Sequence, residues 1–280
     1  MANIRIMSNN QWKCDANQPA WIALGLDCSA KARGEGLARM ILETKPDILG
    51  LQECSALMAD VQLQTLAAGG MQYALLWGRD TPILYRPDKF ELLDAAWRIY
   101  PLEVPGCEGE FNNSQTKSYC IGVFRAKENG RVFIFATTHL WWKSTRPESE
   151  HYQPHSDVAR AYQVGLLMDE LTKLQEKYRC PAIFCGDLNA GIGSKALDAV
   201  FARGFLHAHD IAADFADPYN GHHPCGGGGF MPYVPTSYEK ALDHILLRGD
   251  GVTIRRYERF AADWYMPLSD HLPVWIDCEI

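Results

Sequence analysis

The sequence predicts an α/β protein, because runs of strand length and runs with helical spacing alternate through most of the chain. Several strand-like runs are almost wholly apolar and then turn abruptly polar, as at 181–187, which is typical of strands buried within a sheet. We find no linker sequence between the elements. We therefore predict one domain over residues 1–280.

The first quarter of the chain contains two predicted strands and two predicted helices. A strand-like run at 4–7 comes first. A helical stretch at about 35–43 is followed, after a proline, by the apolar run 47–53, which is predicted to be a strand with an acidic end. Ser55 can then cap a helix that runs to the glycine pair at 69–70.

The middle of the chain is predicted to form a β-hairpin. The runs 117–126 and 131–140 are joined by a turn that contains Asn129-Gly130, and Asn-Gly is a strong hairpin signal because both residues accept positive φ. This pairing places His139 near the far end of the second hairpin strand. A short strand at 82–86 precedes the hairpin.

The second half of the chain continues the alternation. Ser156 is expected to cap a helix that reaches about Tyr178, in which apolar residues recur every three to four positions. The stretch 218–235 is rich in glycine and proline and is expected to be a long loop. The remaining predicted elements are a strand at 181–187, a helix at 194–203 that stops before Gly204, a strand at 243–247 and a closing strand at 272–280.

The composition is that of an ordinary globular protein and limits the choice of partners. Of the 280 residues, 47% are hydrophobic and 22% are charged, and the formal net charge is -7. Tight binding to a long nucleic acid relies mainly on Lys and Arg at phosphates, so this charge disfavours it, while a local basic patch remains open. No apolar run is long enough to span a bilayer.

The start of the chain and its cysteines bear on the compartment. The first predicted strand begins almost at the initiator, which leaves no room for a basic and apolar signal segment. The nine cysteines are odd in number, and several lie in or beside apolar runs, as reduced core residues do. We expect a cytoplasmic protein without membrane contact or an obligate protein partner. The cysteines in or beside apolar runs are Cys14, Cys54, Cys120, Cys185 and Cys278.

Short clusters of oxygen and imidazole ligands stand at the ends of most of these apolar runs. A strand that ends in such a side chain directs it into a pocket, whereas the same side chain in a polar stretch is usually solvated. The clusters offer carboxylate, carboxamide and imidazole groups but no thiol, which suits a hard metal ion and phosphate chemistry. They are Ser8-Asn9-Asn10, Gln52-Glu53, Thr138-His139-Leu140, Gly186-Asp187-Leu188-Asn189, Leu242-Asp243-His244 and Ser269-Asp270-His271.

Each cluster also has a simpler interpretation. The cluster at 186–189 could be an Asx-turn after a strand, and the cluster at 269–271 could be another turn. A single histidine such as His139 is more often a core residue than a catalyst, and Glu53 and Asp243 could be ion-paired carboxylates. The occurrence of all six clusters in one chain favours the functional interpretation, because one structural motif would not predict the other five.

In this order the clusters resemble those of the endonuclease/exonuclease/phosphatase superfamily, whose members include deoxyribonucleases, deadenylases, inositol-polyphosphate 5-phosphatases and neutral sphingomyelinases. The resemblance extends from Arg5 to the C-terminus. It implies a four-layer, deoxyribonuclease-like fold, in which a two-sheet mixed β-sandwich is flanked by helices and the site lies at one edge of the sheets. The motifs specify the superfamily but no substrate within it.

The resemblance also implies a metal site and an activated water. Asn10 and Glu53, with Asp270 nearby, would form an all-oxygen site suited to Mg²⁺ or Mn²⁺. Asp187 would orient or deprotonate the attacking water, and Asn189 would donate to a phosphate oxygen. The division of acid and base roles stays open at this point.

Two histidines would act on the phosphate. His271 would donate a hydrogen bond to the phosphoryl group, oriented and kept charged by a carboxylate, for which Asp243 is the best candidate. His139 would place a second imidazole there. Substrate contacts are expected from Tyr85, Trp141 and Trp142, with the alternative that at least one tryptophan belongs to the core.

Three positions depart from the family pattern. Asn9 stands where an aromatic residue is usual, and His244 stands where tyrosine is common. Trp12 stands where abasic-site endonucleases carry Asp, which argues against a repair role.

The sequence therefore predicts a metal-dependent hydrolase of phosphate esters. A small or short substrate, such as a nucleotide, an oligonucleotide or a phosphorylated metabolite, fits the acidic chain best. Two alternatives remain open. The first is a nuclease or deadenylase that binds polymer through a local basic groove, and the second is a binding protein that keeps the fold without turnover.

Overall fold

The computed structural model describes residues 1–12, 23, 25, 27, 29–216, 223–225, 234–236, 241–260, 262–265 and 267–280. Within these residues the strands form two large sheets and one strand pair. In spatial order, the first sheet contains β10 (Asp214–Ala216), β14 (Thr253–Arg259), β15 (Val274–Glu279), β1 (Asn3–Asn10), β2 (Ile48–Gln52), β4 (Ile83–Tyr85) and β3 (Ala74–Leu76). The second contains β5 (Phe90–Ile99), β6 (Ser118–Ala126), β7 (Val132–His139), β8 (Ala182–Asp187), β13 (Asp243–Arg248) and β9 (Leu206–His207).

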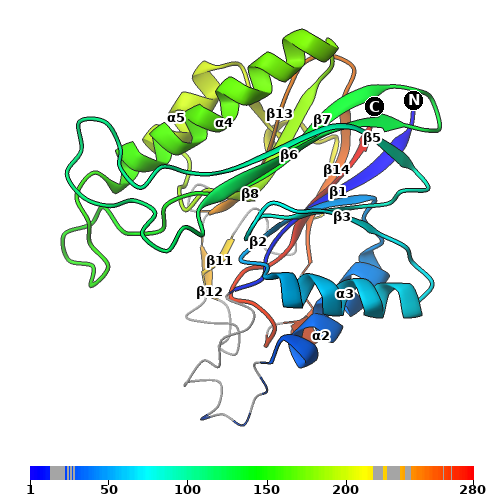
Figure 1. Cartoon of the computed structure of the whole chain (residues 1–280), viewed down its shortest axis with the longest axis horizontal. Coiled ribbons are helices and arrows are strands. Elements are labelled where there is room, and N and C mark those ends of the chain that lie inside the picture. The colour runs from blue at the N-terminus through cyan, green and yellow to red at the C-terminus, as the bar shows by residue number, and fades with distance from the viewer. Residues whose placement is uncertain are drawn as a thin grey trace.

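The two sheets pack face to face, and helices cover their outer faces (Figure 1). Helices α2 (Ala30–Thr44) and α3 (Ala56–Ala68) cover the first sheet, and α4 (Ser156–Tyr178) and α5 (Lys195–Ala202) cover the second. Both sheets mix parallel and antiparallel pairs. The four-layer fold implied by the resemblance is therefore confirmed. Two short helical segments, the α-helix α6 (Ala208–Ile211) and the 3₁₀-helix η2 (Asp263–Tyr265), are also present.

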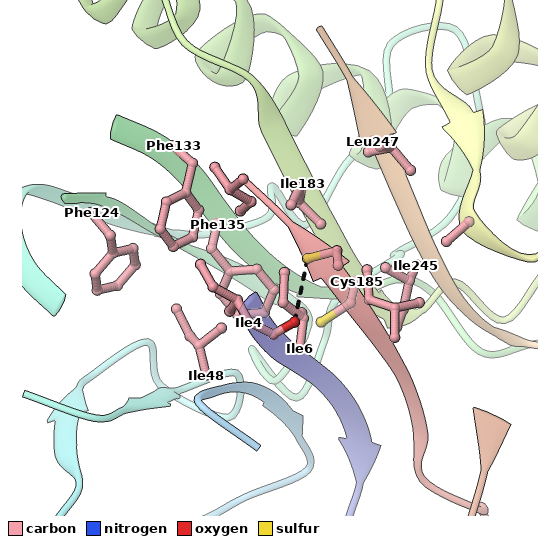
Figure 2. Close-up of a cluster of buried hydrophobic side chains, with 14 of the residues drawn as sticks. Ile4, Ile6, Ile48, Phe124, Phe133, Phe135, Ile183, Cys185, Ile245 and Leu247 are labelled. Carbon is pink, nitrogen blue, oxygen red and sulfur yellow. Dashed lines mark hydrogen bonds between the residues drawn. The ribbon is translucent and has the colours of Figure 1, made fainter. Parts of the chain in front are cut away.

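Successive side chains of a strand point to opposite faces of its sheet, so the inner strands contribute to two hydrophobic cores. In β1, Ile4 and Ile6 point between the sheets, where they join Phe133 and Phe135 of the opposite sheet (Figure 2). Met7 points the other way and packs in the cluster under α2 and α3. The middle strands are thus apolar on both faces, as the sequence of β1 and β2 requires. Burying these side chains is the main force that holds the layers together.

Most predicted elements are present with shifted ends. The hairpin at 117–140 is confirmed as β6 and β7, although only Gly130 of its Asn-Gly pair has positive φ, at 74°. Ser55 caps α3 as predicted, with its hydroxyl accepting from the backbone N–H of Met58 at 3.1 Å. Helix α2 begins at Ala30, earlier than the predicted 35, because Ser29 is its cap.

Two predictions on the second half were wrong. Ser156 does not cap α4, because its hydroxyl donates to the carbonyl of Gln153 at 2.9 Å and the cap position is His155, which makes no side-chain cap bond. The stretch 218–235 is not wholly a loop, since β11 (His223–Cys225) pairs antiparallel with β12 (Val234–Thr236). His222 and the glycines at 226–229 lie outside the described residues.

Strands β5 and β14 had no counterpart in the prediction. Each pairs across a register shift, between Leu92 and Asp94 in β5 and between Ile254 and Arg256 in β14. An inserted residue of this kind breaks the alternation of apolar and polar side chains, which is the signal used to recognise a strand. Both strands therefore looked irregular in the sequence.

The cysteine and membrane predictions agree with the described part of the chain. Cys54, Cys120, Cys185 and Cys278 are buried, as core residues are, while Cys14 lies outside the described residues. None of the helices in the described ranges is long and apolar enough to cross a membrane. One domain over 1–280 stays a prediction.

Candidate active site

Strand pairing brings the predicted ligand clusters to one edge of the sandwich. In the first sheet β1 and β2 run parallel and end together, with Asn10 beside Gln52, so that Glu53 follows directly. In the second sheet β7 and β8 run parallel and end together, with His139 beside Asp187. Strand β13 runs the other way and begins beside Asp187 with Asp243. The register alone therefore assembles five of the predicted site residues.

Two further predicted residues come from the segment before β15. Because β15 runs antiparallel to β1, with Val274 beside Ser8, the residues before Val274 lie near the end of β1. Ser269 fixes this segment: its hydroxyl donates to the carbonyl of Asn10 at 2.7 Å and accepts from the backbone N–H of His271 at 3.1 Å. Asp270 and His271 therefore join the same edge.

Tight turns hold the ends of the site strands. Asn10 accepts the N–H of Trp12 at 2.9 Å, and Asp187 accepts the N–H of Asn189 at 2.8 Å, so each forms an Asx-turn. Trp12, Asn189 and Glu53 have positive φ of 46°, 47° and 53°. The simpler interpretation as turns is thus correct for 186–189, yet the same side chains also line the pocket described below. A positive φ at a residue other than glycine raises the conformational energy of the backbone, and residues of this kind are frequent at functional sites.

Gly186 is required by a close approach of β8 to β7. Its φ is +150°, and a Cβ placed on it would lie 1.9 Å from the carbonyl oxygen of Thr138. We expect Gly186→Ala to lower the free energy of unfolding by about 3 kcal/mol or more, because backbone must move at the strand that carries Asp187. Chemical denaturation would measure this. Gly165→Ala in α4, where a Cβ meets nothing within 4 Å, is the control, and an equal effect of both changes would contradict the assignment.

His271 and Asp243 form a buried hydrogen-bonded pair. Nδ1 of His271 lies 2.7 Å from Oδ2 of Asp243, and the ring exposes 13% of its side chain. Burial by itself would lower the pKa of His271, but the carboxylates of Asp243, Asp270 and Asp187 raise it well above its ordinary value. His271 is therefore an imidazolium whose Nδ1–H donates to Asp243 and whose Nε2–H faces the pocket.

His139 has the opposite charge state. Burial, the ammonium of Lys117 and the charge of His271 hold the pKa of His139 well below its ordinary value. Nζ of Lys117 lies 2.6 Å from Nε2 of His139, and an ammonium has no acceptor, so this nitrogen carries a lone pair. Nε2 of His139 thus accepts from Lys117, and the role of His139 as a second imidazole on the phosphate stays a prediction.

Asp187 lies at the centre of the site. Nδ2 of Asn10 donates to its Oδ2 at 2.9 Å, while Nε2 of His271 lies 3.8 Å from the same oxygen. Burial raises the pKa of Asp187 to about 6, and the charge of Asp243 adds to the effect while His271 opposes it. A carboxylate with a pKa near neutrality is suited to take a proton from water.

Glu53, Asp270 and Asn10 supply oxygens that suit a divalent cation. Oδ1 of Asp270 is buried and has no hydrogen-bond partner among the described residues, and burial followed by the charge of Glu53 raises its pKa to about 6. A cation would satisfy this oxygen. Within the described ranges no three His, Cys, Asp or Glu side chains could by themselves hold a metal ion, so an amide oxygen and water must complete such a site, as Mg²⁺ accepts.

Six of the predicted site residues line a pocket of about 660 Å³, namely Glu53, His139, Asp187, Asn189, Asp270 and His271. Its floor consists of buried side chains, and its rim carries Trp12, Trp142, which is 42% exposed, and the polar residues Asn113, Ser114 and Thr116. Among the described residues, the lining contains the carboxylates of Glu53, Asp80, Asp187 and Asp270 and the cations Lys117 and His271.

Two of the three predicted substrate contacts are not brought to this pocket. Tyr85 packs against Phe124 between the sheets, and it pairs with Ile48 at the far end of β2, because β4 runs antiparallel to β2. Trp141 is fully buried against Phe111. The predictions that Tyr85 and Trp141 contact the substrate were therefore wrong, because both side chains pack in the core. Trp142 does line the pocket.

Sequence reasoning missed Lys117. A signal was present, because in the predicted hairpin the strand that starts at 117 runs antiparallel to the strand that ends at His139. The observed register, with Tyr119 beside Thr138, places Lys117 at that end. Asp80 and Ser55 also line the pocket and had no functional prediction.

A buried pair of neutral histidines lies behind Asp243. Nε2 of His244 donates to the carbonyl of Ala190 at 2.8 Å, and its Nδ1 lies 2.9 Å from Nε2 of His207. Burial lowers the pKa of His244 to about 4 and holds that of His207 well below its ordinary value. This pair fixes the loop that follows Asn189.

The histidine pair predicts a loss of stability in acid. The unfolded imidazole of His244 binds a proton near pH 6.5 and the folded one only near pH 4, so the unfolded state holds more protons in this window and the free energy of unfolding falls as the pH drops through it. We expect His244 to contribute about 3 kcal/mol to this fall. Urea denaturation at pH 7.5 and 4.5 should show a smaller fall in the free energy of unfolding for His244→Gln than for the wild type. An equal fall for both proteins would contradict the prediction.

A family model and two curated proteins match the chain. The model described as the Endonuclease/Exonuclease/phosphatase family matches residues 21–271. Protein angel of Drosophila melanogaster is 30% identical over 172 residues, which are 58% of this chain and 44% of that protein. The CCR4-Not complex 3'-5'-exoribonuclease subunit Ccr4 of Candida glabrata is 24% identical over 223 residues, 69% of this chain and 24% of that protein. The chain thus spans less than half the length of these relatives.

Solved structures share the fold over nearly the whole chain. An endonuclease/exonuclease/phosphatase from Bacteroides vulgatus has a TM-score of 0.74 at 19% identity and covers 100% of both chains. A mannosyl-6-phosphatase from Bacteroides thetaiotaomicron has a TM-score of 0.71 at 21% identity, with 99% of this chain and 100% of that chain covered. At these identities the likeness establishes the fold.

Proposed function

The chain belongs to the endonuclease/exonuclease/phosphatase family, and we propose that it is a metal-dependent hydrolase of phosphate esters that acts on a small or short phosphorylated substrate. One observation carries the proposal. A single pocket combines two hard carboxylate ligands, Glu53 and Asp270, with the buried base Asp187 and the imidazolium of His271. A binding protein without turnover has no need for a base and a charged donor aimed at one point.

The acidic lining argues for a bound cation. Among the described residues of the lining, four carboxylates outnumber the two cations, Lys117 and His271, so these residues would repel a phosphate without further positive charge. Glu53 and Asp270 would hold Mg²⁺ or Mn²⁺, with the amide oxygen of Asn10. When bound, such a cation polarises the phosphate and stabilises the departing oxygen.

The chain's own residues supply the remaining steps. Asp187 orients the attacking water and accepts its proton, held in place by the amide of Asn10 at 2.9 Å. His271 donates from Nε2 to a non-bridging phosphoryl oxygen, where negative charge grows in the transition state. Asp243 keeps the ring of His271 in one tautomer and orientation through the 2.7 Å bond. Asn189 would add a neutral donor to the phosphate, and its Nδ2 lies 3.1 Å from both Nε2 of His139 and the carbonyl oxygen of Leu140.

The size and charge of the site support a small substrate. A pocket of about 660 Å³ is in the range of small-molecule sites, and the net charge of -7 disfavours long polyanions. The mannosyl-6-phosphatase that shares the fold acts, by its name, on a phosphorylated sugar. The second candidate is action on polymer, favoured by the similarity to an exoribonuclease subunit.

A substrate panel tests the proposal. Sugar phosphates, nucleotides, short single-stranded RNA, short single-stranded DNA and duplex DNA are each incubated with Mg²⁺, with Mn²⁺ and with EDTA, and released phosphate and chain length are measured. We expect turnover of a small ester that EDTA abolishes. Turnover confined to long polymer would favour the second candidate, and full turnover in EDTA would overturn the metal assignment.

A further inference from the structure

Lys117 brings a fixed positive charge to the floor of the pocket. Its side chain is almost fully buried, at 4% exposure for the residue, yet it lines the pocket together with His139 and Asn189. Buried lysines are rare because desolvating an ammonium is costly, so its position requires a compensating interaction. Nε2 of His139 accepts from its ammonium at 2.6 Å, and the carboxylate of Asp187 interacts with its positive charge.

The backbone around Lys117 is built to hold it in place. The buried side chain of Asn112 accepts the backbone N–H of Lys117 at 2.9 Å and donates to the carbonyls of Lys117 and Tyr100, both at 2.8 Å. The hydroxyl group of the next residue, Ser118, forms a 2.8 Å hydrogen bond with the hydroxyl group of Thr81. Lys117 therefore starts β6 from a rigid frame, which is how a positioned ligand-binding group is supported.

We propose that Lys117 binds the terminal oxygens of a phosphomonoester and thereby makes this pocket select monoesters over diesters. The inference rests on the proposed function. Lys117 and His271 come from different strand ends and line the same pocket, so a phosphoryl group between them meets a nitrogen donor on either side.

The charge and shape of the floor both favour a monoester. Above its second pKa near 6 a phosphomonoester carries about two negative charges, whereas a diester carries one. A second ester group on a phosphoryl oxygen would also have to lie among buried polar side chains, since Lys117, His139 and Asp187 expose 4%, 1% and 2%. An ammonium facing an esterified oxygen would be left without its strongest partner. The leaving group instead extends toward the rim at Asn113, Ser114 and Trp142.

The test compares two esters with one leaving group. At pH 8 with Mg²⁺, kcat/KM is measured for p-nitrophenyl phosphate and for methyl p-nitrophenyl phosphate. We expect Lys117→Met to lower the value for the monoester by about a hundredfold and that for the diester by less than about tenfold. Lys143→Met is the matched control, because it removes the same charge from a lysine near Trp141 that does not line the pocket, and it should change neither value by more than about threefold.

A binding measurement separates this inference from the proposed function. Inorganic phosphate and dimethyl phosphate are titrated into the Mg²⁺-loaded protein by calorimetry, and Lys117→Met should weaken the first about a hundredfold while leaving the second nearly unchanged. If the wild type cleaves neither ester, the proposed function fails and calorimetry still decides on Lys117. Thermal midpoints are recorded, and Lys117→Gln replaces the Met variant if that does not fold. Equal losses for both esters or for both anions would overturn the inference.

Discussion

Glu53→Gln should lower kcat/KM for phosphate-ester hydrolysis by about a thousandfold. The carboxamide is nearly isosteric with the carboxylate, so the turn at this residue, with its φ of 53°, is retained. What is lost is the charge that holds a hard cation, and cation stabilisation of phosphoryl transfer amounts to several kcal/mol. The measurement is steady-state hydrolysis as a function of Mg²⁺, together with Mn²⁺ binding followed by electron paramagnetic resonance.

The control for Glu53 is a carboxylate outside the pocket. Glu150, whose side chain is 85% exposed, can be changed to Gln with the same loss of charge, and both binding and hydrolysis should persist. The metal assignment predicts that Glu53→Gln weakens Mn²⁺ binding and raises the Mg²⁺ needed for half-maximal rate. Unchanged Mn²⁺ binding with a lost rate would instead make Glu53 a residue of the chemical step.

His271→Asn and Asp243→Asn should each lower kcat by at least about a hundredfold, and the double change should cost little more than the worse single one. The 2.7 Å bond and the raised pKa of His271 show that the two side chains form one charged unit. Removal of either partner removes the oriented imidazolium, and the second change then has little left to remove. Residues that act as a unit are non-additive in this way.

This cycle also distinguishes a structural pair from a catalytic one. The kcat values and thermal midpoints of both single variants and of the double are measured at saturating Mg²⁺, so that metal affinity does not enter. A structural pair predicts stability losses that track the loss of rate. Kinetic losses that add, with the fold intact, would show that His271 and Asp243 act separately.

The sequence predicted those parts of the fold in which one segment carries a complete local signal. Apolar runs of strand length gave β2, β8 and β13 to within a residue or two, and Ser55 gave the start of α3. Strands β5 and β14 were not predicted, because each contains a register shift that interrupts the alternation of apolar and polar side chains. The predicted cap of α4 was wrong, because the hydroxyl of Ser156 donates to the carbonyl of Gln153 and does not accept from a helix N–H.

The candidate site likewise has residues that a local sequence signal predicts and residues whose position depends on packing. A polar residue directly after a buried strand must lie at a sheet edge, and the described structure places the six ligand clusters, from Asn10 to His271, at one such edge. Tyr85 and Trp141 could not be assigned in this way, because a side chain's exposure depends on the segment that packs over it. Phe124 covers Tyr85, and Phe111 covers Trp141. The catalytic roles themselves stay predictions.

The sequence by itself determined which residue types stand at the strand ends, because strand period and turn chemistry act over a few neighbouring residues. Only the tertiary structure decided their charge states. His139 is neutral and His271 is charged because one ring is buried beside the ammonium of Lys117 and the other lies among three carboxylates. These partners come from distant segments of the chain, and electrostatic interactions depend on distance and burial in space, which no local pattern encodes.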